Sequence, residues 1–264
     1  MNAIQLTALA DRVLTRHEQK NLPINLLAIA GREGIDLYPD SYGLDFLGQI
    51  RYSGPEFVLL YEKPRQGLPQ TRVNFTIAHE LGHYFIPEHN RYIRQASRAG
   101  STQPFANSPR REGEADVFAA ALLVPTFELD KRIGRNKGSK LPLNEILKLA
   151  KNCDVSAEAC VFRFTQYWPK PMVAIVSCRG EILYWFTSNG ASPLRYALSK
   201  GQSVPDKSKA AHLFRETSDR IRYDDMDGKV WFPGKNNASA PSQVWEETVK
   251  LGDQGRVLTV LSWS

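Results

Sequence analysis

The sequence has 264 residues, of which 42% are hydrophobic, so it is long and apolar enough for one large or two modest folded domains. No apolar run approaches the roughly 20 residues of a membrane-spanning helix, and the amphipathic N-terminus lacks the apolar core of a signal peptide. The formal net charge of +6 does not by itself select a partner. Because Cys153, Cys160 and Cys178 show no Cys-x-x-Cys spacing, we expect reduced, mostly buried thiols in a cytoplasmic protein without a membrane segment.

The first part of the chain predicts two helices followed by a small sheet. Residues 2–19 are amphipathic, and a second helix includes residues 26–30. Three short segments then alternate in the manner of strands, at residues 34–38, 48–52 and 57–61, with a Ser-Gly-Pro turn joining the last two. A Pro- and Gly-rich loop at 63–70 follows this sheet.

The next segment, R-V-N-F-T-I-A-H-E-L-G-H-Y at residues 72–84, is the most informative in the chain. Its apolar positions suit a half-buried helix, and it contains H-E-x-x-H at His79, Glu80 and His83. Residues four apart lie on the same face of a helix, so both imidazoles can bind one metal ion. Glu80 then stands beside them as the general base for a water molecule. The alternative is a surface or core histidine pair that arose by chance.

Pro87 is predicted to end this helix, and residues 88–109 read as a long polar loop with little periodicity. Such a loop inside an enzyme is often a lid or a binding element. His89 lies in it, beyond the reach of the helical spacing argument. We keep His89 as an alternative ligand or a substrate contact.

Basic residues gather in two clusters along the chain. They are Arg91, Arg94, Arg98, Arg110 and Arg111 in the first, which also holds Tyr92 and Phe105, and Lys131, Arg132, Arg135, Lys137 and Lys140 in the second. Such surfaces attract nucleic acid or an acidic partner by charge. A merely solvated face of a mildly basic protein would give the same pattern, so nucleic-acid contact stays an open expectation.

A second helix at residues 111–125 supplies candidates for a third metal ligand, which a catalytic zinc site requires. Glu112 and Asp116 are four residues apart and share a helix face, whereas Glu114 points elsewhere. We assign Glu112 as the third ligand and Asp116 as the carboxylate that accepts the outer N–H of a liganding histidine. Glu114 is the rival ligand. The alternative is that these acids only favour the positive end of the helix dipole, which explains why acids lie there but not why two of them align on one face.

Further helices are predicted at residues 127–132, 143–151 and 157–167. The last two, joined by a short turn, resemble a helix-turn-helix. Their exposed faces lack the run of basic and amide residues that reads base edges, so we interpret this segment as mainly structural.

Three stretches together resemble the ImmA/IrrE family of bacterial metallopeptidases. The run F-T-I-A-H-E-L-G-H-Y is followed by E-x-E-A-D-x-F-A-A-x-L-L-x-P, and L-K-L-A-K-N-C-D-V-S-A-E-A-C-V-F-R-F at residues 147–164 is similar to a later family segment. The resemblance covers roughly residues 20–167 and implies Zn²⁺ held by His79, His83 and Glu112. It also implies that Glu80 acts as general base and that Asp116 occupies the family's Asn/Asp position.

Trp168-Pro169-Lys170-Pro171 marks a predicted domain boundary. Strands at 172–178 and 182–186 flank Arg179-Gly180 as a hairpin, and further strands are expected at 230–232 and 257–263, with 245–250 a strand or a helix. The expected fold class is α+β, with a zincin-like helical core beside a small N-terminal sheet, then helix-turn-helix-like helices and a C-terminal β-rich or α+β module. The expected domains are a peptidase domain at 1–125, a helical segment at 126–168 and a regulatory or substrate-binding module at 169–264.

The resemblance implies a zinc-dependent, site-specific endopeptidase that cleaves a DNA-binding repressor, often of the helix-turn-helix type, or an antitoxin-like partner, in a stress or mobile-element response. The alternative is a stress-sensing regulator whose C-terminal domain binds nucleic acid or a small ligand and whose peptidase activity is weak or conditional. A purely structural zinc site fits poorly, because two histidines and one distant glutamate leave an open coordination position.

Overall fold

A computed structural model describes residues 1–43, 46–98, 108–135, 143–216, 220–233, 240–252 and 255–264. The fold is α+β, as predicted, with one three-stranded and one five-stranded sheet among the described residues. The chain divides into two compact units, Met1–Glu128 with Ala150–Ser156, and Leu129–Leu149 with Ala157–Ser264. Among the described residues, the helices are too short or too polar for one of them to cross a bilayer.

The first unit contains the predicted helices and the small sheet. Its elements are α1 (Ala3–Arg16), α2 (Leu26–Arg32), β1 (Ile35–Asp40), β2 (Gly48–Ser53), β3 (Glu56–Glu62), α3 (Gln70–Phe85), α4 (Pro87–Arg98) and α5 (Pro109–Leu123). In the sheet β3 is central, parallel to β1 and antiparallel to β2. The predicted strands at 34–38, 48–52 and 57–61 are therefore confirmed to within two residues at each end.

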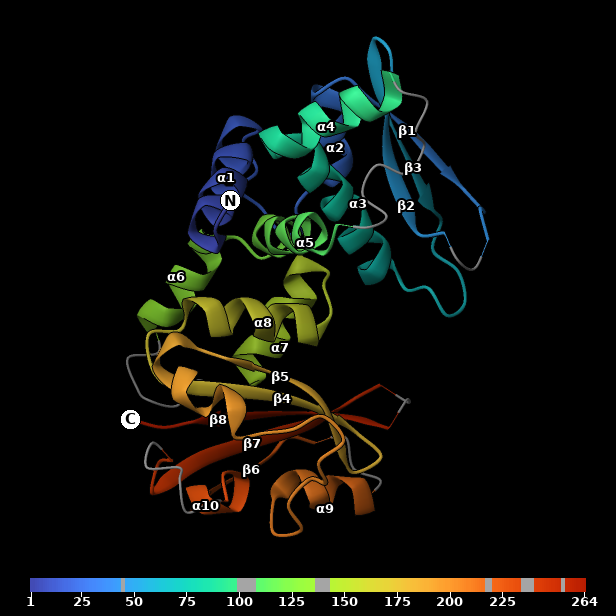
Figure 1. Cartoon of the computed structure of the whole chain (residues 1–264). Helices are drawn as coiled ribbons and strands as arrows, with labels where there is room; N and C mark the ends of the chain where they lie inside the picture. The colour runs from blue at the N-terminus through green and yellow to red at the C-terminus, as the bar shows by residue number, and fades with distance from the viewer. Residues whose placement is uncertain (44–45, 99–107, 136–142, 217–219, 234–239, 253–254) are drawn as a thin grey trace. The chain divides into compact units, whose positions relative to one another are not determined.

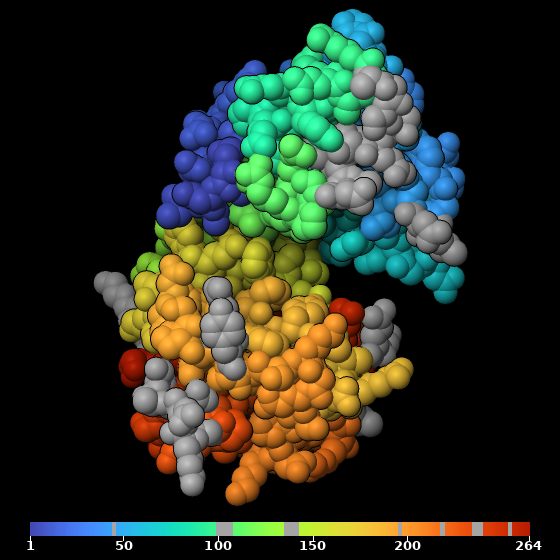
Figure 2. All heavy atoms as spheres, viewed as in Figure 1, coloured from blue at the N-terminus to red at the C-terminus, as the bar shows by residue number. Residues whose placement is uncertain are grey.

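The helix α1 packs along α5, and the two lie side by side in Figures 1 and 2. Asn2 caps α1 by accepting a hydrogen bond from the backbone N–H of Gln5, whose side chain reaches back to the Asn2 N–H. The buried face of α1 is Leu6, Ala10, Val13 and Leu14, at helical spacing. This face covers one side of α5 and so fixes the helix that carries Glu112 and Asp116.

The predicted loop at 88–109 is wrong over its first half, because residues 87–98 form α4. Pro87 does end α3, but it also begins the next helix, where a missing N–H and a fixed φ cost nothing. His89 and Ile93, four residues apart, form the buried face of α4. Residues 99–107 of the expected loop lie outside the described residues.

The second unit is built on the five-stranded sheet. Its elements are most of α6 (Thr126–Arg135) and α7 (Leu143–Cys153), then α8 (Ala157–Tyr167), β4 (Met172–Cys178), β5 (Glu181–Thr187), a 3-10 helix (Asn189–Tyr196), α9 (Lys209–Arg215), β6 (Arg222–Asp227), α10 (Gly228–Trp231), β7 (Gln243–Leu251) and β8 (Arg256–Ser262). The strand order is β5-β4-β8-β7-β6, and every pairing is antiparallel. The sequence predicted a separate helical segment at residues 126–168. Residues 129–149 and 157–168 of it belong to the same compact unit as this sheet.

The hairpin of β4 and β5 and the strand β8 match the prediction, and the segment left as strand or helix is the strand β7. The predicted strand at 230–232 is wrong, because it overlaps the short helix α10, which Asp227 caps through the Lys229 N–H. The strand β6 was missed because its sequence R-Y-D-D-M-D is too polar for a strand pattern. It is an edge strand, where polar residues face solvent.

Candidate metal centre

Two helices of the first unit bring the predicted site residues together. The helix α3 carries His79, Glu80 and His83, and α5 carries Glu112 and Asp116. The helices approach closely at Gly82, where an added Cβ would lie 3.2 Å from the Phe118 ring and 3.3 Å from the Ala115 backbone. A larger residue would push α5 away from the two histidines.

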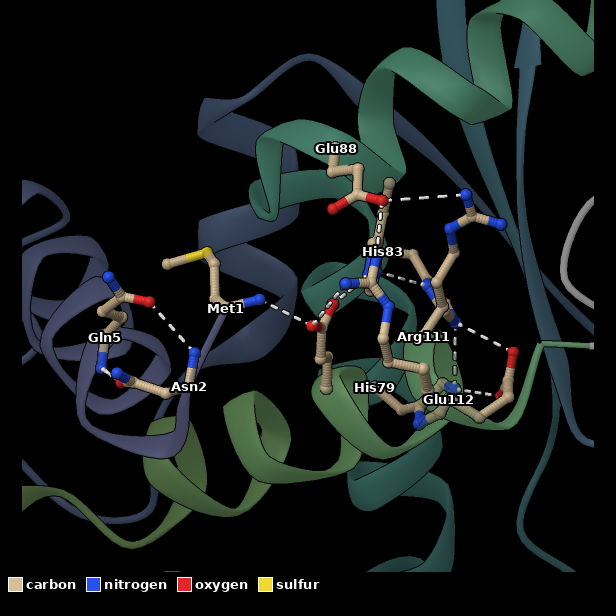
Figure 3. A network of polar contacts seen from close by, with 11 residues as sticks. Met1, Asn2, Gln5, His79, His83, Glu88, Arg111 and Glu112 are labelled. Atoms are coloured by element: carbon tan, nitrogen blue, oxygen red, sulfur yellow. Dashed lines mark hydrogen bonds and ion pairs between the residues drawn. The ribbon is translucent and has the colours of Figure 1, made fainter.

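Three donor atoms converge between these helices. Nε2 of His79 lies 3.1 Å from Nε2 of His83 and 3.1 Å from Oε2 of Glu112, and Nε2 of His83 lies 3.6 Å from Oε1 of Glu112. Figure 3 draws these residues together, and the donor atoms of all three lie within 4.8 Å of one another. Tetrahedral Zn²⁺ with bonds of 2.0–2.1 Å needs donor atoms about 3.3–3.4 Å apart, so the separations between these three side chains are of the size that zinc requires.

The outer nitrogen of His79 faces Asp116. Nδ1 of His79 lies 2.9 Å from Oδ1 of Asp116, which is hydrogen-bond distance. When the ring is neutral and donates its Nδ1–H to this carboxylate, Nε2 is the nitrogen left to bind a metal. This is the contact that the predicted role of Asp116 requires.

Glu80 is next to His79 in the sequence, but its side chain contacts the three-stranded sheet. Its Oε2 accepts a hydrogen bond of 2.7 Å from the backbone N–H of Ile50 in β2, and the residue is buried, with 9% of its surface exposed. Gly48, also in β2, lies against Thr76 and Glu80, leaving no room for a side chain there. The edge strand β2 therefore positions the predicted general base.

The outer nitrogen of His83 faces a second histidine. Nδ1 of His83 lies 3.1 Å from Nδ1 of His89, and Nε2 of His89 lies 2.9 Å from Oε2 of Glu114. The other oxygen of Glu114 accepts a hydrogen bond of 2.6 Å from the amino group of Met1 (Figure 3). His89 is fully buried. It is therefore neither exposed to a substrate nor part of the three-donor group, and Glu114, the rival ligand, is held away from that group.

The electrostatics of the site favour a cation at its centre. Burial lowers the pKa of His79, but hydrogen bonds to Asp116 and Glu112 outweigh it and raise that pKa to about 10. Hydrogen bonds from His79 and His83 hold the pKa of Glu112 well below its usual range. Burial, by contrast, lowers the pKa of His89 to about 4, so its ring is neutral at pH 7. A proton on His79 occupies the position that a metal cation would otherwise take.

The sequence pattern missed the contact between His83 and His89. The signal was present: Pro87 suits the first position of a helix as well as it suits a helix stop, and His89 and Ile93 are four residues apart. Only the turn between α3 and α4 brings His89 back onto His83, and no spacing rule gives that turn.

Comparison with known proteins agrees with this geometry. Residues 55–165 match the family model of the IrrE N-terminal-like domain, Peptidase_M78. The match includes every residue of the three-donor group and confirms the family resemblance drawn from the sequence. No curated protein sequence matches the chain significantly.

Solved structures extend the likeness beyond the IrrE N-terminal-like domain. A Mycobacterium tuberculosis transcriptional regulator superposes on 98% of this chain and on 76% of its own length, with a TM-score of 0.64 and 17% sequence identity. At that identity the likeness concerns the fold. Both compact units are therefore shared with that protein as folded elements.

Much of the first basic cluster contacts other residues of the first unit. The guanidinium of Arg94 lies 4.5 Å from the centre of the Tyr52 ring, and that of Arg111 lies 4.2 Å from the centre of the Tyr92 ring. Arg110 pairs with Glu88 at 2.6 Å. Phe105, Lys137 and Lys140 of the predicted basic surfaces lie outside the described residues.

Proposed function

We propose that this protein is a zinc-dependent endopeptidase whose metal is held by His79, His83 and Glu112. The convergence of these three donors beside Glu80 is the observation that carries the proposal. Three protein ligands with a fourth position left open characterise catalytic zinc, whereas structural sites close all four. The match of residues 55–165 to a peptidase family supports the same assignment.

When bound, Zn²⁺ supplies the Lewis acidity that activates a water molecule and polarises a peptide carbonyl. Glu80 accepts a proton from the attacking water and passes it to the leaving amine. The N–H of Ile50 holds one oxygen of Glu80, leaving the other for this transfer. Asp116 keeps His79 in the tautomer whose Nε2 is free.

We propose that the substrate is a DNA-binding transcriptional repressor of the helix-turn-helix type or an antitoxin-like partner, cut at one site in a stress or mobile-element response. The support is the family resemblance carried by the sequence around His79 and Glu112, together with the regulatory name of the structural neighbour.

The test mixes the purified, zinc-loaded protein with candidate helix-turn-helix repressors and follows cleavage by mass spectrometry. We expect one discrete cut that a chelator abolishes and added Zn²⁺ restores. The Glu80→Gln variant should retain stoichiometric zinc but lose cleavage, since it keeps the side-chain shape and loses the base. Cleavage by Glu80→Gln at the wild-type rate would refute the assignment of the base.

A second candidate function is favoured by one observation, the fold shared over 98% of the chain with a protein named as a transcriptional regulator. In this alternative the protein senses stress, and its C-terminal unit binds nucleic acid or a small ligand while peptidase activity is weak or conditional. Binding of a repressor or of DNA without any cut, in the same assay with zinc present, would favour this alternative.

A further inference from the structure

The two histidines of the proposed zinc site are supported on their outer nitrogens by different means. His79 contacts a carboxylate directly, through Asp116 at 2.9 Å. His83 reaches a carboxylate only through a second imidazole, with His89 between it and Glu114 at 3.1 Å and 2.9 Å. The His83, His89 and Glu114 series is also the more buried of the two, with side chains 3%, 0% and 8% exposed, whereas the Asp116 side chain is 54% exposed.

The direction of the hydrogen bonds in this series follows from the metal. If Nε2 of His83 is the donor atom to zinc, the proton of the neutral ring is on Nδ1. Nδ1 of His83 then donates to Nδ1 of His89, which must be the acceptor. The proton of His89 is consequently on Nε2, from which it donates to Oε2 of Glu114. Every polar atom in the series has one consistent role, and the series ends on an anion.

We propose that His89 and Glu114 are positioning residues that fix the tautomer and ring orientation of His83 for zinc binding. This inference rests on the proposed function only in requiring the metal site, not in requiring cleavage. Partners of this kind orient the ligand and raise its basicity. Here the partner is a histidine whose own orientation Glu114 sets, so the effect of Glu114 passes through His89.

The burial of the series explains why an intermediate imidazole is effective. A buried His83 without an outer partner would leave an unsatisfied N–H, which is costly, or would rotate to satisfy it and lose its alignment. Because His89 is fully buried, bulk water does not reach it to substitute for its ring. The turn at Pro87 and the helix α4 therefore serve the metal site although they supply no ligand to it.

The test measures zinc affinity by competition with a chromophoric chelator for the wild type and for His89→Ala, His89→Gln and Glu114→Gln. The matched control is His17→Ala, which removes another buried histidine paired with a glutamate, His17 Nε2 to Glu33 at 2.9 Å, in the same unit. The absorption spectrum of each Co²⁺-loaded variant reports ligand geometry, and the thermal unfolding of each metal-free variant reports folding.

We expect His89→Ala to weaken zinc binding by about 10–100-fold and to change the Co²⁺ spectrum. His89→Gln should recover most of the affinity, since its amide oxygen can accept from His83 while its NH₂ donates to Glu114. The zinc affinity of Glu114→Gln should lie between those of His89→Ala and His89→Gln, because the glutamine keeps an acceptor for His89 but loses the negative charge. His17→Ala should change thermal stability without changing zinc affinity.

Equal zinc affinity in wild type and His89→Ala would overturn the inference, and so would equal losses in His89→Ala and His17→Ala, which would indicate a merely structural role. Should His89→Ala not fold, the comparison of His89→Gln and Glu114→Gln with wild type decides the matter by the same two readouts. A wild-type protein that binds zinc as expected but cleaves no repressor would refute the proposed function and leave this inference intact. A wild type that binds no zinc would overturn both.

Discussion

Nδ1 of His79 lies 2.9 Å from Oδ1 of Asp116, so a side chain of α5 sets the tautomer of a histidine on α3. We expect Asp116→Ala to weaken zinc binding by about 10–100-fold, because the ring then lacks its anionic partner and is less basic. Chelator competition measures the effect. The control is Asp36→Ala, which removes an exposed aspartate on β1. An unchanged affinity in Asp116→Ala would show that the contact does not serve metal binding.

The choice between Glu112 and Glu114 as third ligand can be decided by metal analysis. Glu112→Ala removes one of the three converging donors, so we expect it to lose bound zinc after dialysis. Glu114→Ala leaves all three donors in place and should retain zinc, although more weakly. Metal retained by Glu112→Ala and lost by Glu114→Ala would reverse the ligand assignment.

The close approach of α3 and α5 at Gly82 predicts a loss of stability on substitution. An added Cβ would lie 3.2–3.3 Å from Phe118 and from the backbone of Ala115, and backbone cannot move aside cheaply. Overpacking costs about 1–3 kcal/mol and the better helix propensity of alanine returns about 1 kcal/mol, so Gly82→Ala should destabilise the first unit. We also expect weaker zinc binding.

The matched control for this substitution is Gly113→Ala, because Gly113 lies within α5 and has nothing within 4 Å of an added Cβ. It should raise the free energy of unfolding by about 0.5–1 kcal/mol. All five tryptophans belong to the second unit, so their fluorescence does not report on unfolding of the first unit. Unfolding of the first unit is therefore followed by circular dichroism. Equal stabilisation by both substitutions would contradict the predicted contact.

Glu246 in β7 predicts a pH dependence in the second unit. Burial raises its pKa above the ordinary 4.5, although the carboxylate accepts hydrogen bonds from the Trp231 indole and the Ala210 N–H. In the unfolded chain Glu246 loses its proton at lower pH than in the folded chain. Its contribution to stability is therefore fully present below pH 4.5 and is lost as pH rises through the raised pKa.

The measurement compares wild type with Glu246→Gln, followed by tryptophan fluorescence in urea from about pH 5 to about pH 8. As pH rises, the free energy of unfolding of the wild type should fall relative to that of Glu246→Gln. A difference that is independent of pH, or that favours the wild type at high pH, would contradict the raised pKa.

The elements near the site were predictable where local pattern alone sets the structure. The H-E-x-x-H helix, the three strands before it and the acidic start of α5 all follow from side-chain periodicity and turn residues. The helix α4 was not predictable from Pro87, because proline suits both a helix stop and a helix start. In the second unit the polar edge strand β6 and the short helix α10 carried too weak a pattern.

The sequence by itself determined that His79 and His83 share a helix face and that Glu112 and Asp116 share another, because a helix repeats every 3.6 residues. Tertiary structure alone decided that these two faces meet, through the close contact at Gly82, and that Glu80 is held by the backbone of β2. It also decided that His89 supports His83 and that Glu114 supports His89. Periodicity gives the direction of a side chain on its own element, but its partner on another element depends on how the two pack.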